Sequence, residues 1–128
     1  MKSLQKCVLV VEDEPIIAEL WCMYIEGLAL DVCGTAATAE VAIALAEKHR
    51  PAVILMDMRL RGRLDGVDAS LAINISVGSK IIFVTGSKEA ETLARIELAH
   101  PETVLFKPVG DRRPELRVLD GVKIIPTA

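Results

Sequence analysis

Aromatic residues are scarce in this chain of 128 residues, which contains one Trp, one Tyr and two Phe. Four scattered rings make a poor stacking platform for the bases of single-stranded nucleic acid. An excess of positive charge is missing as well, since 15 Lys and Arg stand against 18 Asp and Glu, a formal net charge of -3. A protein that binds a phosphate backbone would carry a positive stripe. We therefore expect no nucleic-acid partner.

Long apolar stretches are also missing. The longest run without a charged residue, Ala69 to Ser79, covers 11 residues, whereas a membrane-spanning helix needs about 20. The first apolar run, Cys7 to Val11, is too short for the apolar region of a signal peptide and leads into acidic residues. We therefore expect a cytoplasmic chain with no membrane partner.

Cysteine is infrequent, and the three cysteines are Cys7, Cys22 and Cys33. Their number is odd, and no two of them have the C-x-x-C spacing of a metal or redox site. This pattern favours buried, reduced thiols over a disulfide or a metal site. Neither His49 nor His100 has metal-ligand spacing, and we expect both at helix ends.

What the chain does contain is alternating strand and helix patterns. Apolar residues make up 52% and charged residues 26% of the sequence, which indicates one folded domain over residues 1–128. Apolar runs typical of buried strands alternate with segments of helical spacing, which predicts an α/β fold with a doubly wound, five-stranded parallel sheet. The expected strands cover residues 7–11, 31–36, 52–56, 80–85 and 103–106.

The expected helices lie between these strands. Pro15 and Thr38 suit the starts of the first two. The third is expected to align Val67, Leu71 and Ile75 on one face. The fourth, over residues 88–99, is expected to present a thin apolar face made of Ala90, Leu93, Ala94 and Leu98.

The last segment, residues 111–128, is less regular. Asp111 could begin a short helix that ends before Gly121, and an extended stretch from Val122 to Ile125 follows. A longer amphipathic helix would be the usual cover for such a sheet. The extended stretch is expected to pack on its own domain or to be mobile, and pairing with the sheet edge of a second copy, which would form a homodimer, is the alternative.

Acidic residues follow the strong strands. Glu12 and Asp13 come directly after the first strand, and Asp57 comes directly after the third. In an open α/β sheet, ligands bind outside the carboxyl ends of the strands. Glycines at the first turn would indicate a dinucleotide site, but acids stand there instead. Converging carboxylates need a cation, and oxygen ligands suit Mg²⁺ or another hard divalent ion such as Mn²⁺.

Two further strand ends carry groups that suit a phosphoryl group held beside that metal. The fourth strand ends at Thr85, followed by Gly86, and the fifth ends at Lys107 and Pro108. A hydroxyl, a small residue and a lysine beside a cation are the parts that such chemistry uses, because it depends mainly on positioning and charge neutralisation.

The ordered set Glu12-Asp13, Asp57, Thr85-Gly86 and Lys107-Pro108 resembles the receiver domain of two-component response regulators, over roughly residues 5–110. The stretch from Leu60 to Gly66 also resembles a receiver subgroup with the pattern L-x-G-x-x-D-G. The resemblance implies a flavodoxin-like strand order 2-1-3-4-5. It also implies Mg²⁺-dependent phosphoryl transfer from a histidine kinase or phosphotransfer protein, without the turnover of an enzyme.

The resemblance also assigns roles to residues. Asp57 would be the phosphoacceptor, and the metal ligands would be Glu12, Asp13, Asp57 and the backbone carbonyl of Arg59. Thr85, the Gly86 N–H and Lys107 would contact the phosphoryl group, and the peptide bond before Pro108 would be cis. At 128 residues the chain is expected to be a stand-alone receiver that signals to an unidentified downstream protein by direct contact.

The sequence departs from the family at three places. Val104 stands where receivers commonly have the switch Tyr or Phe, Arg61 stands where many have Pro, and the segment after Pro108 fits the usual last helix poorly. We interpret the arginines at 59, 61 and 63 as mainly solvated, in a loop less rigid than usual.

Two rival interpretations follow. One is a phosphorylation-independent pseudo-receiver that acts as a binding module. The other is a phosphatase of the haloacid dehalogenase type. That family resemblance would require an aspartate at position 59, where this chain has Arg59.

Overall fold

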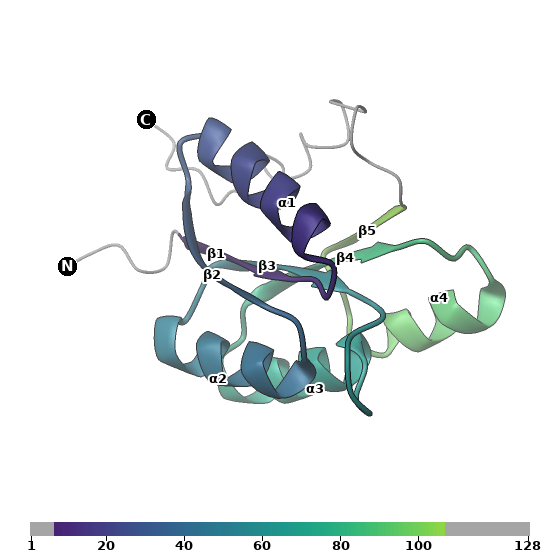
Figure 1. The fold of residues 1–128 in the computed structure, drawn as a ribbon. Coiled ribbons are helices and arrows are strands. Elements are labelled where there is room, and N and C mark those ends of the chain that lie inside the picture. The colour runs from purple at the N-terminus through teal and green to yellow at the C-terminus, as the bar shows by residue number, and fades with distance from the viewer. Residues whose placement is uncertain (1–6, 107–128) are drawn as a thin grey trace.

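The computed structural model describes residues 7–106, which form five strands and four helices in strict alternation (Figure 1). In chain order these elements are β1 (Cys7–Val11), α1 (Pro15–Gly27), β2 (Asp31–Ala36), α2 (Ala39–His49), β3 (Val53–Asp57), α3 (Gly66–Ser76), β4 (Lys80–Thr85), α4 (Ala90–Glu97) and β5 (Thr103–Phe106).

The strands form one parallel sheet in the order β2-β1-β3-β4-β5. Every residue of β1 and of β3 is buried, which explains why these strands read as continuous apolar runs rather than alternating ones. Strand order and class confirm the predicted α/β fold with the flavodoxin-like order 2-1-3-4-5.

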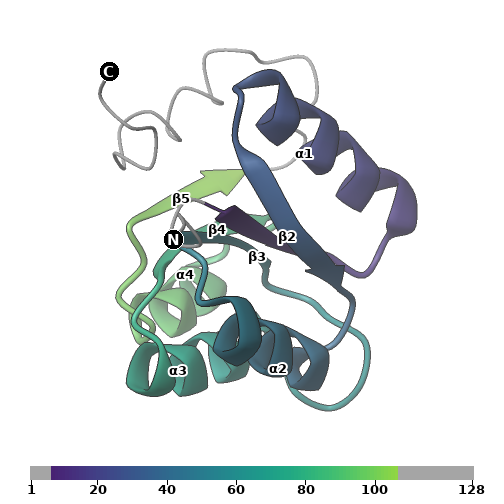
Figure 2. The same cartoon turned by 90° about the vertical axis from the view of Figure 1, so that its left-hand side faces the viewer.

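Helices cover both faces of the sheet, with α1 on one side and α2, α3 and α4 on the other (Figures 1 and 2). Two apolar cores result, one on each face. The core under α1 joins Trp21 and Ile25 to buried side chains of β1, β3, β4 and β5. The opposite core contains Phe83 and the small buried residues of α2. Alternate residues of each strand serve opposite cores, as the two-residue period of a strand requires.

Local signals in the sequence begin the helices. The Thr38 side chain accepts a hydrogen bond from the Val41 N–H at 3.1 Å, as expected of a helix-capping residue. At the start of α3, Asp65 and Asp68 form a reciprocal capping box, with hydrogen bonds of 3.0 and 2.9 Å. Pro15 occupies the first turn of α1.

Of the apolar face predicted for α3, only Val67 lies in the core. Ile75 is 89% exposed and Leu71 is 39% exposed, and the helix instead buries Val67, Ala69, Ser70 and Ile73. The cause lies at the first residue of the helix. A β-carbon at Gly66 would collide with the carbonyl oxygen of Asp57, so the start of α3 packs directly on β3, and this contact sets the rotation of the helix.

The apolar face predicted for α4 is only partly right, since Leu93 packs against the core whereas Ala90 and Ala94 are exposed. The helix buries Ile96, whereas Leu98 is 57% exposed. After Arg95 the chain tightens, because Leu98 and Ala99 each donate a backbone hydrogen bond to the residue three positions earlier. This tighter turn directs Leu98 outward and buries Ala99.

The expectation of three reduced cysteines is wrong for two of them. Cys7 on β1 and Cys33 on β2 form a disulfide, with their Cα atoms 5.4 Å apart. The register of these strands shifts between Val8 and Leu9, so that Cys33 is an extra residue on β2 beside the start of β1. A sequence separation of 26 gives no sign of this proximity.

The predicted short helix and extended stretch within residues 111–128 lie outside the described residues. Within residues 7–106, no helix combines the length and the apolar character that crossing a bilayer requires.

Replacement of Ile96 by Ala should lower the free energy of unfolding by about 2–5 kcal/mol, because it removes a fully buried side chain and leaves a cavity. Leu98→Ala is the matched control and should change it by about 0.5 kcal/mol or less. Urea unfolding followed by circular dichroism measures both, and equal losses in the two variants would contradict the assigned face of α4.

The disulfide predicts a count of reactive thiols. Protein purified without reductant and unfolded in urea should add one maleimide, at Cys22, and three after reduction. In the folded chain Cys22 should react slowly, because burial, with help from Glu26 and Glu19, raises the pKa of its thiol. Intact mass spectrometry gives the count, and three additions before reduction would exclude the disulfide.

Candidate functional site

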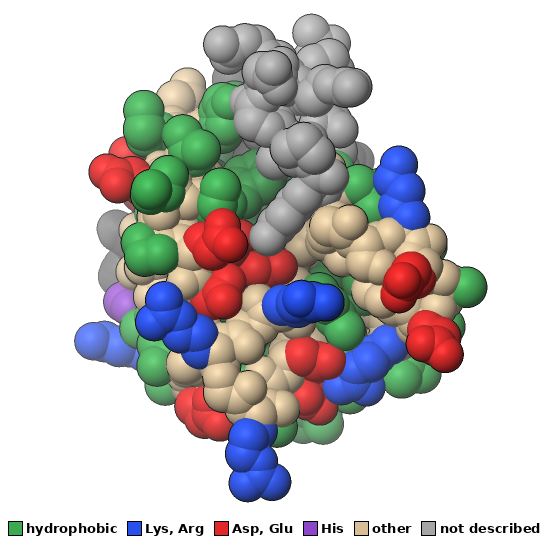
Figure 3. Space-filling model, turned by 45° about the vertical axis from the view of Figure 1, so that its right-hand side comes forward, with side chains coloured by type: hydrophobic (Ala, Val, Ile, Leu, Met, Phe, Trp, Pro, Cys, Tyr) green, Lys and Arg blue, Asp and Glu red, His purple; other side chains and the backbone are tan. Residues whose placement is uncertain are grey.

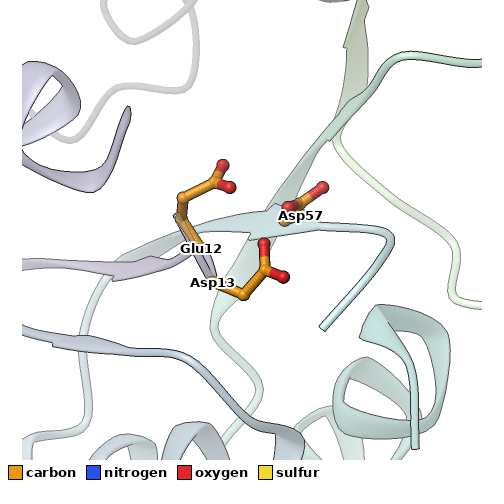
Figure 4. Close-up of side chains that lie close together, drawn as sticks. All are labelled: Glu12, Asp13 and Asp57. Carbon is orange, nitrogen blue, oxygen red and sulfur yellow. The ribbon is translucent and has the colours of Figure 1, made fainter. Parts of the chain in front are cut away.

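Three carboxylates meet at the carboxyl ends of β1 and β3 (Figure 4). Glu12, Asp13 and Asp57 each place one carboxylate oxygen within 4.8 Å of the other two. Glu12 and Asp57 are 4% and 5% exposed, and Asp13 is half-buried. The three acids that the sequence places after two separate strands therefore lie at one point.

Backbone pairing brings these acids together. Val11 and Met56 are partners in the β1–β3 ladder, so the next residues, Glu12 and Asp57, leave that ladder side by side. The Glu12 N–H donates to the carbonyl of Ala36 at the end of β2, at 2.8 Å. This bond extends the sheet by one residue and fixes the backbone beneath the first carboxylate.

Such a cluster is electrostatically costly without a cation. At an effective dielectric near 20, two unit charges this close repel by about 3 kcal/mol. A donor set made only of carboxylate oxygens fits a hard divalent ion, Mg²⁺ or Mn²⁺, which binds few protein ligands and keeps several waters. The cluster of Glu12, Asp13 and Asp57 thus has the composition and spacing of a metal site.

Asp13 and Asp57 of this cluster line an open cavity of 680 Å³ at this edge of the sheet. Figure 3 shows acidic side chains gathered in a hollow of this face. Residues from three strand ends and the loops after them line the cavity: Asp13, Glu14, Asp57, Met58, Arg59, Asp65, Thr85, Gly86, Ser87, Glu89 and Thr92. Thr85 and Gly86 therefore lie at the same cavity as the carboxylates.

The loop after β4 is organised by hydroxyl groups. The Thr85 hydroxyl accepts a hydrogen bond from the Ser87 N–H at 3.1 Å. The Ser87 hydroxyl lies 3.4 Å from that of Thr92 on α4 and accepts a bond from the Glu89 N–H at 3.1 Å. A hydroxyl both accepts and donates, so this bond leaves the Thr85 hydroxyl able to donate as well.

The loop after β3 is anchored more firmly than the sequence suggests. Arg61 is exposed, as expected of a solvated arginine, but its backbone forms a bridge with Thr38 and its guanidinium donates to the backbone oxygen of Asp13 at 3.3 Å. The Arg61 N–H also donates to the carbonyl of Ala37 at 3.1 Å. A proline at this position would lack that donor. The side chains at positions 59 and 63 are exposed.

An ion-pair cluster that the sequence analysis did not identify lies next to the cavity. Arg95 on α4 donates to both carboxylate oxygens of Asp65, at 2.8 and 3.0 Å, and to Asp68 at 3.1 Å. The acids could have been found from their capping-box spacing. Nothing in the sequence links them to an arginine 27 and 30 residues away.

The cluster shifts the pKa values of its members. Partial burial acts to raise the pKa of Asp65, but the hydrogen bonds from Arg95 and from the Asp68 N–H outweigh it and hold that pKa below its usual value. The hydrogen bond with Asp65 in turn raises the pKa of Arg95. The pair is therefore fully ionised at neutral pH.

Two predicted site residues, Lys107 and Pro108, lie outside the described residues. Val104 on β5 pairs with Phe83 and is half-buried in the core on the α4 side of the sheet.

Comparison with known proteins supplies relatives of this arrangement. The family model of the response regulator receiver domain matches residues 8–118. The phyllosphere-induced regulator PhyR of Methylorubrum extorquens is 36% identical over 79% of this chain, and the transcriptional regulatory protein PdtaR of Mycobacterium tuberculosis is 29% identical over 91%. The matched regions are 38% and 57% of those proteins, so the chain spans only part of their length.

Solved structures agree with the sequence relatives. The signal receiver domain of a modulated diguanylate cyclase from Desulfovibrio desulfuricans is 32% identical, with a TM-score of 0.79 and 90% and 91% of the two chains covered. The receiver domain of AraT from Geobacillus stearothermophilus is 28% identical, with a TM-score of 0.78 and 91% of each chain covered. The chain therefore belongs to the response regulator receiver domain family.

Proposed function

We propose that Asp57 is a phosphoacceptor and that the chain takes its phosphoryl group from a phosphohistidine on a histidine kinase or phosphotransfer protein. The observation that carries this proposal is the position of Asp57. It ends the central strand β3, lies within 4.8 Å of two further carboxylates, and shares its cavity with the Thr85 hydroxyl.

The transfer is a substitution at phosphorus. A carboxylate oxygen of Asp57 forms a bond to the phosphorus atom, the bond from phosphorus to the donor's imidazole nitrogen breaks, and the imidazole leaves with the electron pair. The acyl phosphate on Asp57 is later hydrolysed by water, which restores the carboxylate. The protein undergoes this cycle itself and is not a turnover enzyme.

The metal site and the hydroxyl loop have complementary roles in this proposal. Glu12, Asp13, Asp57 and the Arg59 backbone carbonyl would hold Mg²⁺, which supplies positive charge against the incoming phosphoryl oxygens. Thr85 and Gly86 line the same cavity, and the Thr85 hydroxyl and the Gly86 N–H would donate to those oxygens. Pairing of Lys107 with the phosphoryl group, next to a cis bond to Pro108, stays a prediction.

An apolar stripe on α1 would receive the phosphodonor protein. Ile16, Leu20 and Met23 are 76%, 41% and 62% exposed and recur at positions one and two turns apart. Glu14, just before this helix, lines the cavity. Hydrophobic side chains gather beside the acidic hollow in Figure 3. A partner docked on this stripe would therefore reach Asp57.

Val104 favours a second candidate function. In the absence of the family's switch ring, the chain could act as a pseudo-receiver that binds its downstream partner without regard to phosphorylation. The two functions differ in one measurable respect. A pseudo-receiver binds that partner equally well as wild type and as Asp57→Asn under phosphorylating conditions.

Incubation with acetyl phosphate and Mg²⁺ should add one phosphoryl group to the wild type, and Asp57→Asn should abolish the adduct. Asp31→Asn removes an exposed carboxylate at the start of β2 and should phosphorylate normally. Intact mass spectrometry at neutral pH, where an acyl phosphate survives the measurement, reads out all three proteins. An unmodified wild type would refute the proposal.

Replacement of Asp13 by Asn should weaken Mg²⁺ binding about tenfold or more, because it removes an anionic ligand. A tenfold loss of affinity corresponds to about 1.4 kcal/mol of binding free energy. Glu14→Gln is the control, since Glu14 is an exposed neighbour outside the three-carboxylate cluster. Titration calorimetry measures the affinities of both variants. Equal affinities for wild type and Asp13→Asn would remove Asp13 from the ligand set.

A further inference from the structure

Arg95 joins α4 to the start of α3 through three short hydrogen bonds. Two go to the carboxylate of Asp65 in a side-by-side arrangement, and the third goes to Asp68. A bidentate guanidinium–carboxylate pair fixes direction as well as distance. The Arg95 side chain is 39% exposed, so the pair contributes geometry more than stability.

Asp65, the main partner of Arg95, is connected to Asp57 through the neighbouring Gly66. Asp65 lines the cavity and is followed by Gly66, which packs on the backbone of Asp57 so closely that a β-carbon would collide with its carbonyl oxygen. The Gly66 N–H also donates to the carbonyl of Met58 at 2.8 Å. The residues that Arg95 binds are therefore in direct contact with the end of β3, so that a change at Asp57 is transmitted to them.

The body of α4 is held weakly by apolar contacts. Ile96 is the buried residue of this eight-residue helix, whereas α3 buries five residues. Its first turn approaches the cavity through the Ser87–Thr92 contact, and its last turn is held by Arg95. A helix with few buried apolar groups is the element whose position polar contacts can change.

We propose that Arg95 is a positioning residue through which the charge on Asp57 sets the position of α4. The inference rests on the proposed phosphorylation of Asp57. Conversion of the Asp57 carboxylate to an acyl phosphate adds about one negative charge to the cavity that Asp65 lines, because the carboxylate loses its own charge as it gains a phosphoryl group that carries about 1.5 to 2. Repulsion displaces the start of α3, and Arg95 carries α4 with it. The hydroxyl contacts of Thr85, Ser87 and Thr92 form a second connection between the cavity and α4. Neither connection requires an aromatic ring at position 104.

If the Arg95 ion pair had only a structural role, it would stabilise α4 equally whether or not Asp57 is phosphorylated. The two roles are therefore separated by the response of α4 to site occupancy, not by its stability. Beryllofluoride with Mg²⁺ is the probe, because it mimics a phosphoryl group on a carboxylate. Amide hydrogen exchange of residues 90–97, read by mass spectrometry, gives the response of α4, and exchange of residues 58–68 gives that of the loop.

In the wild type, the probe should change exchange in α4 by about fivefold or more, the lower end of couplings between protein sites. In Arg95→Gln the change should fall below about twofold while the loop still responds, and Arg95→Lys should restore part of it. Arg63→Gln is the matched control, since it also removes one arginine, an exposed one in the loop before α3 that takes no part in the Arg95 cluster.

The results separate the two proposals. Fluorine NMR first tells whether the wild type loads with beryllofluoride. Failure to load would overturn the proposed function and this inference together. The inference alone would be overturned if the wild type bound beryllofluoride with no change of hydrogen exchange in α4. It would also be overturned if exchange in α4 of Arg95→Gln changed as much as in the wild type. Loss of the α4 response in Arg63→Gln would overturn it too, by assigning the effect to net charge.

Discussion

β1 is hydrogen-bonded to β2 on one side and to β3 on the other, and the arrangement of the acidic edge depends on this pairing. Parallel neighbours end at the same edge, so the residues after Val11 and Met56 emerge together. The carboxylates of Glu12, Asp13 and Asp57 repel one another there. Apolar burial on both faces of the sheet, about 1.5–3 kcal/mol for each fully buried side chain, holds the strands against this repulsion.

The helices differ in how they are held to this sheet. α1, α2 and α3 each bury several residues in one of the two cores, whereas α4 depends on hydroxyl and guanidinium contacts that end at the cavity. The molecule thus combines a sheet edge that holds charge in a fixed place with one helix whose contacts are sensitive to charge. Signalling in receivers requires both properties, because a modification must be held firmly and also be detected elsewhere.

Most of the fold could be predicted because buried parallel strands leave a simple trace in the sequence, a continuous apolar run that ends in a polar residue. The same rule located the carboxylates, since strand ends are fixed by sequence and neighbouring strands end together. The inward faces of α3 and α4 could be predicted only in part. The packing of Gly66 on Asp57 rotates the first, and a tightened turn after Arg95 ends the second early. The Cys7–Cys33 disulfide and the Arg95 cluster depend on contacts between distant segments, which local patterns do not encode.

The irregular start of β2 has a consequence for how copies of the protein meet. β2 is the outermost strand on its side of the sheet, and a regular outer strand offers unpaired backbone groups to any other chain. Here the extra residue at Cys33 interrupts the even spacing of those groups, and the disulfide ties this position to β1. A second chain would find no continuous template along β2, so this side of the sheet is protected against edge-to-edge aggregation.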